Sequence, residues 1–207
     1  MNRRIIALSF MLTLCTMLFS ASISFSGGKS TLIMREGEKS VSLTEGAEVI
    51  SGSMKITASS ITLSGEDWKE IESRGKIEIT DSERGISIKT SILWFDRIDE
   101  ILVISSFFEL DDIPDQLYAQ AGSLRYDMKN EKLEMGMQVT LMKVADGEVM
   151  KCSSESVTFD RNSGILSLLG GARVEWKGDS YEAEMITVDT SDNTISLSGR
   201  IKGTING

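Results

Sequence analysis

Aspartates recur along the chain at nearly regular intervals, and their carboxylates are the side chains best suited to chemistry. An apolar residue, any residue and a second apolar residue precede each one. The copies are Leu93-Trp94-Phe95-Asp96, Leu124-Arg125-Tyr126-Asp127, Val157-Thr158-Phe159-Asp160 and Ile186-Thr187-Val188-Asp189, with the aspartates 31, 33 and 29 residues apart. A calcium site needs several oxygen ligands converging on one ion, whereas each copy offers one carboxylate. Because aspartate also accepts a backbone hydrogen bond two residues on, we interpret the pattern as a repeated turn.

A second group of carboxylates, Asp111, Asp112 and Asp115, surrounds Pro114. Paired carboxylates can hydrolyse glycosides, but this group is more simply a solvated acidic connection between two halves of the fold. The chain has no histidine, which removes the usual general base, the common serine and cysteine triads and most zinc sites. It also lacks the glycine-rich Lys-Ser/Thr loop of nucleotide hydrolases. We therefore predict a protein that is not an enzyme and uses no cofactor and no metal.

The chain is acidic, with 22 Lys+Arg against 31 Asp+Glu and a formal net charge of −9. Phosphate binding needs clustered Lys and Arg, so this balance argues against a nucleic-acid partner. Cys15 lies in the N-terminal apolar run and leaves Cys152 alone in the remaining chain. We assign Cys152 no role, and expect the body to be stabilised by its own core, for which roughly 180 residues suffice.

The N-terminus has the pattern of a signal peptide, which we place at residues 1–26. Met1 to Arg4 carries two positive charges, Ile5 to Phe19 is apolar, and Ser20-Ala21-Ser22 supplies the small residues at which a signal peptidase cleaves. The competing interpretation is an uncleaved anchor, because the uncharged stretch from Ile5 to Phe25 is long enough to span a bilayer. Both interpretations place the body, residues 27–207, outside the cytoplasm as a single domain.

From Ser30 onward, apolar residues recur with period two between clusters of Gly, Asn, Asp and Ser, which is typical of half-buried strands. The short intervals between strands indicate antiparallel pairing of consecutive strands. The helical candidate is Glu66 to Ser73, although the same segment also suits a strand bent around Gly75. The alternating segments are Met54-Ile56-Ala58, Ile77-Ile79, Ile86-Ile88, Leu133-Met135-Met137-Val139-Leu141, Ile195-Leu197 and Ile201 to Ile205.

The two apolar residues of each repeat point to one face of the sheet, because side chains alternate along a strand. Two such faces closed on each other make a sandwich or jelly roll. The inner face is either a plain core or a groove that opens for acyl chains, and the methionines at 135–150 are compatible with a groove. If the inner face is a groove, the residues expected to line it and to bind lipid are Leu93, Phe95, Leu124, Tyr126, Met135, Met137, Val157, Phe159, Ile186 and Val188.

Strand-like segments at both ends of the body, Ser30 to Met34 and Ile201 to Ile205, contain no proline and few charges. The unpaired backbone groups of such edge strands can add a strand from another chain. We therefore predict that the two ends are association surfaces, through which copies of the chain join end to end.

Three segments carry a family resemblance: Gly52 to Ile79, Ala121 to Gly136 and Gly170 to Ile205. In the last of them a strand ends in a short turn, Gly178 to Ala183 begins the next strand, and a hairpin rounded by Gly199 follows. This pattern resembles the OstA-like (LptA) domain family of lipopolysaccharide-transport proteins. The resemblance extends over residues 30–205 and implies an all-β fold, a twisted β-jelly roll built from repeated antiparallel hairpins.

The resemblance implies a function in lipid transport. Domains of this family shield the acyl chains of lipopolysaccharide and assemble end to end, between inner-membrane and outer-membrane transport proteins, as a bridge through the periplasm. A cleaved signal makes this chain similar to the soluble periplasmic member, and an uncleaved anchor makes it similar to the LptC-like member of the inner membrane.

The chain departs from the family in being acidic, with no basic cluster for a phosphorylated head group. The expected cargo is therefore lipopolysaccharide or another acylated glycolipid or phospholipid. The alternative is an envelope scaffold or binding module that associates through its sheet edges.

Overall fold

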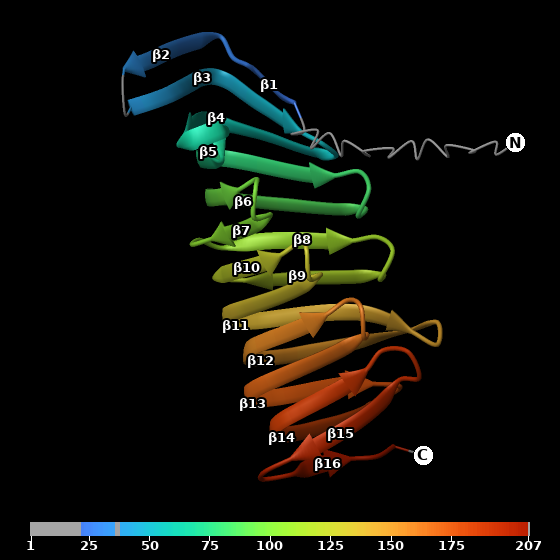
Figure 1. Ribbon diagram of the computed structural model, residues 1–207. Coiled ribbons are helices and arrows are strands. Elements are labelled where there is room, and N and C mark those ends of the chain that lie inside the picture. Colours follow the sequence, from blue (N-terminus) through green and yellow to red (C-terminus); the bar gives the residue numbers. More distant parts are fainter. Residues whose placement is uncertain (1–21, 36–37, 207) are drawn as a thin grey trace, which may run out of the picture.

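The computed structural model describes residues 22–35 and 38–206, and strands make up most of that length (Figure 1). All of the strands belong to one antiparallel sheet, which confirms the predicted all-β fold. A short 3₁₀ turn, η1 (Glu66–Trp68), lies between two of them. The strands are β1 (Ile23–Ser26), β2 (Lys29–Arg35), β3 (Glu38–Ser51), β4 (Met54–Ser64), β5 (Glu70–Asp81), β6 (Ile86–Asp96), β7 (Ile101–Ile104), β8 (Phe108–Asp112), β9 (Leu117–Ala121), β10 (Ser123–Asp127), β11 (Lys132–Ala145), β12 (Glu148–Asp160), β13 (Ile165–Trp176), β14 (Asp179–Asp189), β15 (Thr194–Ser198) and β16 (Lys202–Thr204).

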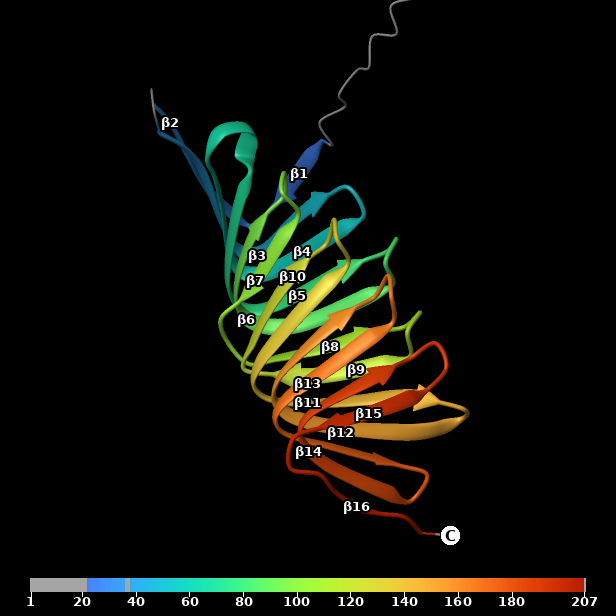
Figure 2. The same ribbon diagram turned by 60° about the horizontal axis from the view of Figure 1, so that its bottom comes forward.

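The long strands are bent, so the sheet folds back on itself as a V (Figure 2). In β6, residues 86–89 pair with β8, whereas residues 93–96 pair with β7. β11 divides its pairing between β9 and β10 in the same way. We call the half that contains β7, β10 and β15 the first layer, and the half that contains β8, β9 and β16 the second layer. The layers meet along the bends, which we call the corner, and together they form a twisted β-jelly roll.

The corner is made by register shifts at which one strand carries extra residues. An extra residue bends a strand and increases its twist. β5 therefore bends around Gly75, between Arg74 and Ile77, and the helix considered for Glu66 to Ser73 is limited to η1. Residues with positive φ occupy this shift and three others, in β3, β11 and β13: Glu45, Gly46, Gly75, Met137, Gln138, Gly170 and Gly171.

Glycine is favoured at Gly170, where φ is +81° and an added Cβ atom would lie 2.9 Å from Glu155 Cβ. We expect Gly170→Ala to lower the free energy of unfolding by about 1–3 kcal/mol, because alanine is strained at this φ and crowds the facing strand. Urea unfolding followed by circular dichroism measures the change. Gly171→Ala is the matched control, because its φ is also positive but nothing lies within 4 Å of the added Cβ. Equal losses in the two variants would contradict the crowding argument.

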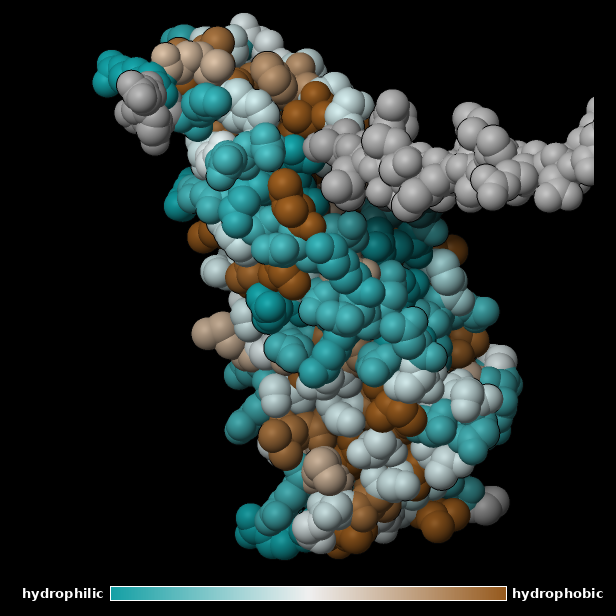
Figure 3. Space-filling model, in the orientation of Figure 1, coloured by the Kyte–Doolittle hydropathy of each residue, from teal (hydrophilic) through white to brown (hydrophobic). Residues whose placement is uncertain are grey.

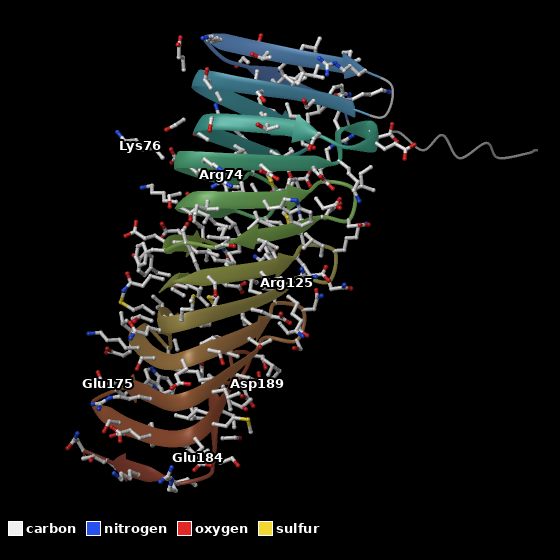
Figure 4. The ribbon with its side chains drawn as sticks, turned by 90° about the vertical axis from the view of Figure 1, so that its left-hand side faces the viewer. Arg74, Lys76, Arg125, Glu175, Glu184 and Asp189 are labelled. Atoms are coloured by element: carbon white, nitrogen blue, oxygen red, sulfur yellow. The ribbon has the colours of Figure 1, made fainter. Side chains whose placement is uncertain are left out.

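The inward-facing side chains of both layers form one continuous hydrophobic core. Burial alternates along the strands, as in β8 and β9, and the core residues are at most 7% exposed. Charged side chains lie mainly on the outside, whereas Asp81, Asp96 and Asp112 are buried at the turns. Figure 4 looks at the corner, with Arg74 and Glu184 near it, Lys76 and Glu175 toward the second layer, and Arg125 and Asp189 toward the first. The period-two pattern of the sequence therefore separates the inner face from the outer face.

The open side of the V carries two rows of turns that face each other across a seam. The first turn row consists of residues 64–70, 96–101, 127–132, 160–165 and 189–194; the second consists of residues 51–54, 81–86, 112–117, 145–148 and 176–179. The repeated aspartates Asp96, Asp127, Asp160 and Asp189 each accept a backbone N–H from two or three residues on. Their interpretation as turn residues is confirmed. Asp81 and Asp112 accept backbone hydrogen bonds in the same way in the second row. The repeat pattern did not identify these two aspartates as turn residues.

Residues 1–21 lie outside the described part of the chain, so the signal peptide or anchor expected over 1–26 stays a prediction. Residues 23–26 form β1, which pairs with residues 48–51 of β3. Cleavage after Ser22 would leave β1 whole. Within residues 22–35 and 38–206, no helix has the length and hydropathy needed to cross a membrane.

Candidate functional site

Nine of the ten residues expected in the interior are buried on the inner face of the first layer. Two cross-strand ladders hold them. One contains Leu93, Ile104, Leu124, Met135, Val157, Leu168, Ile186 and Leu197; the other contains Phe95, Leu102, Tyr126, Leu133, Phe159, Leu166, Val188 and Ile195. Neighbours on a ladder lie directly opposite each other on adjacent strands and pack together. The first layer thus presents an unbroken apolar inner face from β6 to β15.

Met137 is the exception, and its expected place in the interior is wrong. It lies in the register shift of β11 between Gly136 and Val139, has a φ of +66° and is 72% exposed. The extra residues of the shift break the alternation, so the next inward-facing residue is Val139. Met135, before the shift, is buried.

The other half of the interior comes from the second layer, whose residues were not among the ten expected to line it. The alternating segments around Ile56, Ile79, Ile88 and Leu141 were the signal that could have identified them. The main ladder of this layer contains Val49, Ile56, Ile79, Ile88, Leu110, Ala119, Leu141, Cys152 and Val174.

Cys152 is a member of this buried ladder. Burial raises the pKa of its thiol to about 12, so Cys152 acts as a small apolar side chain near neutral pH.

The interior reaches the surface at both ends of the stack. At the N-terminal mouth, Phe25 lies opposite Val49 and Leu32 lies opposite Val41, so both point inward. They are nevertheless 48% and 62% exposed, because β1 and β2 are edge strands. At the C-terminal mouth, Ile205 follows β16 and is 76% exposed. The face seen in Figure 3 is hydrophilic over the middle of the stack, with hydrophobic residues more frequent toward its ends.

Charged side chains centred on Arg161 join the two turn rows across the seam. Arg161 belongs to the first row, and its side chain is 12% exposed. Its Nη1 donates to Glu131 Oε2 at 2.7 Å, its Nε donates to Asp115 Oδ2 at 3.0 Å, and its Nη2 donates to Asp112 Oδ1 at 3.3 Å. Asp112 and Asp115 lie in the second row. The solvated connection expected around Pro114 is therefore wrong for Asp112, whose side chain is 1% exposed.

Arg84 makes the reciprocal link from the second row. Its Nε donates to Glu131 Oε1 at 2.9 Å and its Nη2 donates to Glu100 Oε2 at 3.2 Å, both in the first row. Tyr126, one of the expected interior residues, donates its hydroxyl to Glu131 Oε2 at 2.6 Å. Glu131 is thus shared by both arginines and the tyrosine. The cross-seam network, as we call it, consists of Asp81, Arg84, Glu100, Asp112, Asp115, Tyr126, Glu131 and Arg161.

Burial and hydrogen bonding oppose each other at the carboxylates of this network. Burial acts to raise the pKa of Glu131, but hydrogen bonds from Tyr126, Arg161 and Arg84 outweigh it and lower the pKa. Burial dominates at Asp112, whose pKa is raised although Arg161 attracts its charged form. Glu131 therefore stabilises the fold in its ionised form, and this contribution is lost as the pH falls through its lowered pKa.

A cleft of about 780 Å³ opens on the seam beside the network, on the side of the N-terminal mouth. Its apolar lining is Met54, Phe95, Ile98 and Met128, and three of these, all but Ile98, belong to the buried core. Turns of both rows supply its charged lining, which consists of Asp67, Asp81, Glu83, Arg84, Arg97 and Glu100. The floor of this seam cleft therefore touches the edge of the core at a point between the two mouths.

The fold and the site define a class of protein: a twisted β-jelly roll with a continuous apolar interior, an apolar mouth at each end and a charged seam. Within residues 22–35 and 38–206, no group of three or more His, Cys, Asp or Glu is placed to hold a metal ion. Tyr126 connects the interior to the cross-seam network, and Phe95 connects it to the seam cleft.

No protein-family model matches the chain, and no curated protein matches its sequence. Among solved structures, the chain is similar to LptH from Pseudomonas aeruginosa, described as the LptA-homologous periplasmic component of the conserved lipopolysaccharide transport device. The two sequences are 14% identical, and the match covers 90% of this chain and 96% of that one with a TM-score of 0.31. At this TM-score the two structures diverge too far for LptH to locate a site in this chain.

Proposed function

We propose that the protein is a periplasmic lipid-transport bridge. It would shield the acyl chains of lipopolysaccharide, or of a related glycolipid or phospholipid, between the inner and outer membranes. The observation that carries the proposal is the apolar interior, which runs the length of the stack and is exposed at both mouths. A domain with a purely structural core gains stability by covering residues such as Phe25, Leu32 and Ile205. Their exposure favours a path that continues beyond the chain.

Transfer along this path is passive. The inner side chains of the two layers pack against each other, so an acyl chain enters by replacing contacts between the layers. Each methylene kept out of water contributes about 0.8 kcal/mol, and energy for directed movement comes from another protein. The residues that contact lipid are those of the two first-layer ladders, including Leu93, Phe95, Leu124 and Tyr126, with Met137 excluded by its exposure.

The proposed partners follow from the two ends. The edge strands β1 and β2 at one end and β15 and β16 at the other can each add a strand from another chain. Copies would join end to end, and the terminal copies would meet inner-membrane and outer-membrane transport proteins. The signal peptide exports the chain to the periplasm and is cleaved after Ser22, which retains β1; if it is not cleaved, the apolar segment before β1 anchors the chain in the inner membrane.

Lipid analysis tests the proposal. The full chain, expressed in its own source and purified without detergent, should carry about one acylated lipid, identified by mass spectrometry of the extract. A double variant at the N-terminal mouth, Phe25→Glu with Leu32→Glu, should fold normally and lose most of this loading, because an acyl chain that occupies the mouth would take two unpaired carboxylates out of water. Ile50→Glu, on the outer face of β3, is the control and should keep it.

A recovered glycolipid would support the bridge and identify its cargo, and a phospholipid alone would support the bridge with another cargo. A folded protein without lipid would refute the proposal. That outcome would favour a scaffold that associates through its sheet edges, a second candidate supported by the close packing of the core, in which residues are at most 7% exposed.

A further inference from the structure

The seam cleft lies on the open side of the V, apart from both mouths, and its floor reaches the edge of the core at Met54, Phe95 and Met128. Residues of the second turn row around Met54 and Glu83 line one side, and residues of the first row around Ile98 and Met128 line the other. Its volume of about 780 Å³ lies within the range of about 300–1,000 Å³ typical of small-molecule sites. The cleft is therefore large enough to hold the polar head group of an amphiphile.

The lining of the cleft is divided by polarity in a way that suits such a molecule. Met54, Phe95 and Met128 belong to the continuous core and form the inner part. Asp67 and Glu83 are exposed at the outer part. A molecule bound here would direct its acyl chain toward Phe95 and the first-layer ladders and hold its head group between the turn rows.

The charges of the cleft favour a positive group over a negative one. Arg84 already contacts Asp81, Glu100 and Glu131, so its positive charge is compensated within the protein. Arg97 donates its Nε to the backbone oxygen of Trp68 and its Nη2 to that of Asp67.

The acidic lining is less fully compensated. Among the described residues, the carboxylates of Asp67 and Glu83 form no salt bridge. Asp67, Asp81, Glu83 and Glu100 face Arg84 and Arg97 in the lining, so four negative and two positive charges leave a formal charge of −2, and Asp67 and Glu83 are the carboxylates available to a ligand.

We propose that the seam cleft binds the head group of a lipid that carries an ammonium group and no net negative charge, with Asp67 and Glu83 facing the ammonium. This inference rests on the proposed function, since it assumes that acyl chains enter the interior, and it names the class of lipid that this chain selects. A head group that carries several phosphates would meet uncompensated carboxylates here.

A competition experiment tests the selectivity. The full chain is mixed with equal amounts of lysophosphatidylethanolamine and lysophosphatidylglycerol of the same acyl length, and the bound lipids are counted by native mass spectrometry. The ethanolamine lipid should be preferred by about three- to tenfold, as two exposed ion pairs allow. In Asp67→Asn with Glu83→Gln, the preference should fall to nearly equal binding while the total lipid bound stays unchanged.

Glu72→Gln with Glu78→Gln is the matched control, because both residues are exposed on β5, outside the cleft, and the change in charge is the same. This control should keep the preference. Equal binding of the two lipids by the unaltered chain, or a preference that survives in the Asp67 and Glu83 variant, would overturn the inference and leave the proposed function intact. Absence of both lipids from every form would also overturn the inference, while the lipid extracted from the protein in its own source decides the proposed function separately.

Discussion

Replacement of Arg161 by methionine should destabilise the fold by about 3–5 kcal/mol, the cost of removing one partner from a buried ion network. Arg161 compensates Asp112, whose side chain is 1% exposed, together with Asp115 and Glu131. Methionine fills similar space but leaves these carboxylates without their shared cation. Urea unfolding near neutral pH, compared with that of the unaltered chain, measures the loss.

Arg173→Met is the matched control, because Arg173 also pairs with two carboxylates, Glu175 and Glu182, but on the exposed outer face. It should change stability little, since exposed pairs contribute little. A loss as large as that of Arg161→Met would contradict the argument from burial.

The pH dependence of the Arg161→Met deficit separates a lost charge from lost packing. The pKa of Asp112 is already raised by burial, and loss of Arg161 should raise it further. A carboxyl whose pKa is raised in the fold contributes stability while it is protonated, and this is lost as the pH rises through the folded pKa. The deficit should therefore be smaller at about pH 5 than at about pH 7. An equal deficit at both pH values would indicate that packing dominates.

Replacement of Met135 by lysine should unfold the protein or cost more than about 4 kcal/mol, because the ammonium group would be buried without a partner. Met135 lies on the inner face between Leu124 and Val157 of the adjacent strands. Met137→Lys, two residues along the same strand, should change stability by less than about 0.5 kcal/mol. Thermal unfolding of both variants measures the contrast, and lipid extracted from the folded variant reports its loading.

This pair of variants tests the corner directly. If β11 continued its alternation through Gly136 without a shift, both lysines would face the interior and both variants would fail to fold. A folded Met137→Lys variant that still loads lipid is the result expected from the bulge. A severe loss of stability in Met137→Lys would contradict the position of the register shift.

Local signals were sufficient to predict most of the fold. Period-two alternation identified the inner face of the strands, as for Leu124 and Tyr126, because that pattern depends only on which side of a strand is buried. Asp96 and its counterparts were recognised as turn residues because their interaction is also local. Each accepts a hydrogen bond from a backbone N–H only two or three residues further along the chain.

Features that depend on contacts between distant residues were not predictable from one sequence. Arg84 and Arg161 are 77 residues apart and are brought together by the folding of the sheet. Asp112 is buried against Arg161, which is 49 residues away in the sequence. Without that contact, a charged residue in a turn is expected to be solvated. The exposure of Met137 depends on a bulge for which neighbouring Gly136 was only an indirect signal.

The bent sheet has a mechanical consequence. The ladder hydrogen bonds along β6 and β11 join strands within one layer, so the angle between the layers can change while those bonds stay intact. Opening the V costs contacts across the interior and, at mid-length, the ionic links of Arg84 and Arg161. The two layers therefore form a long hinge that the ionic links of Arg84 and Arg161 stiffen near its centre. A force that separates the layers at one mouth should have a smaller effect beyond these links, at the other mouth.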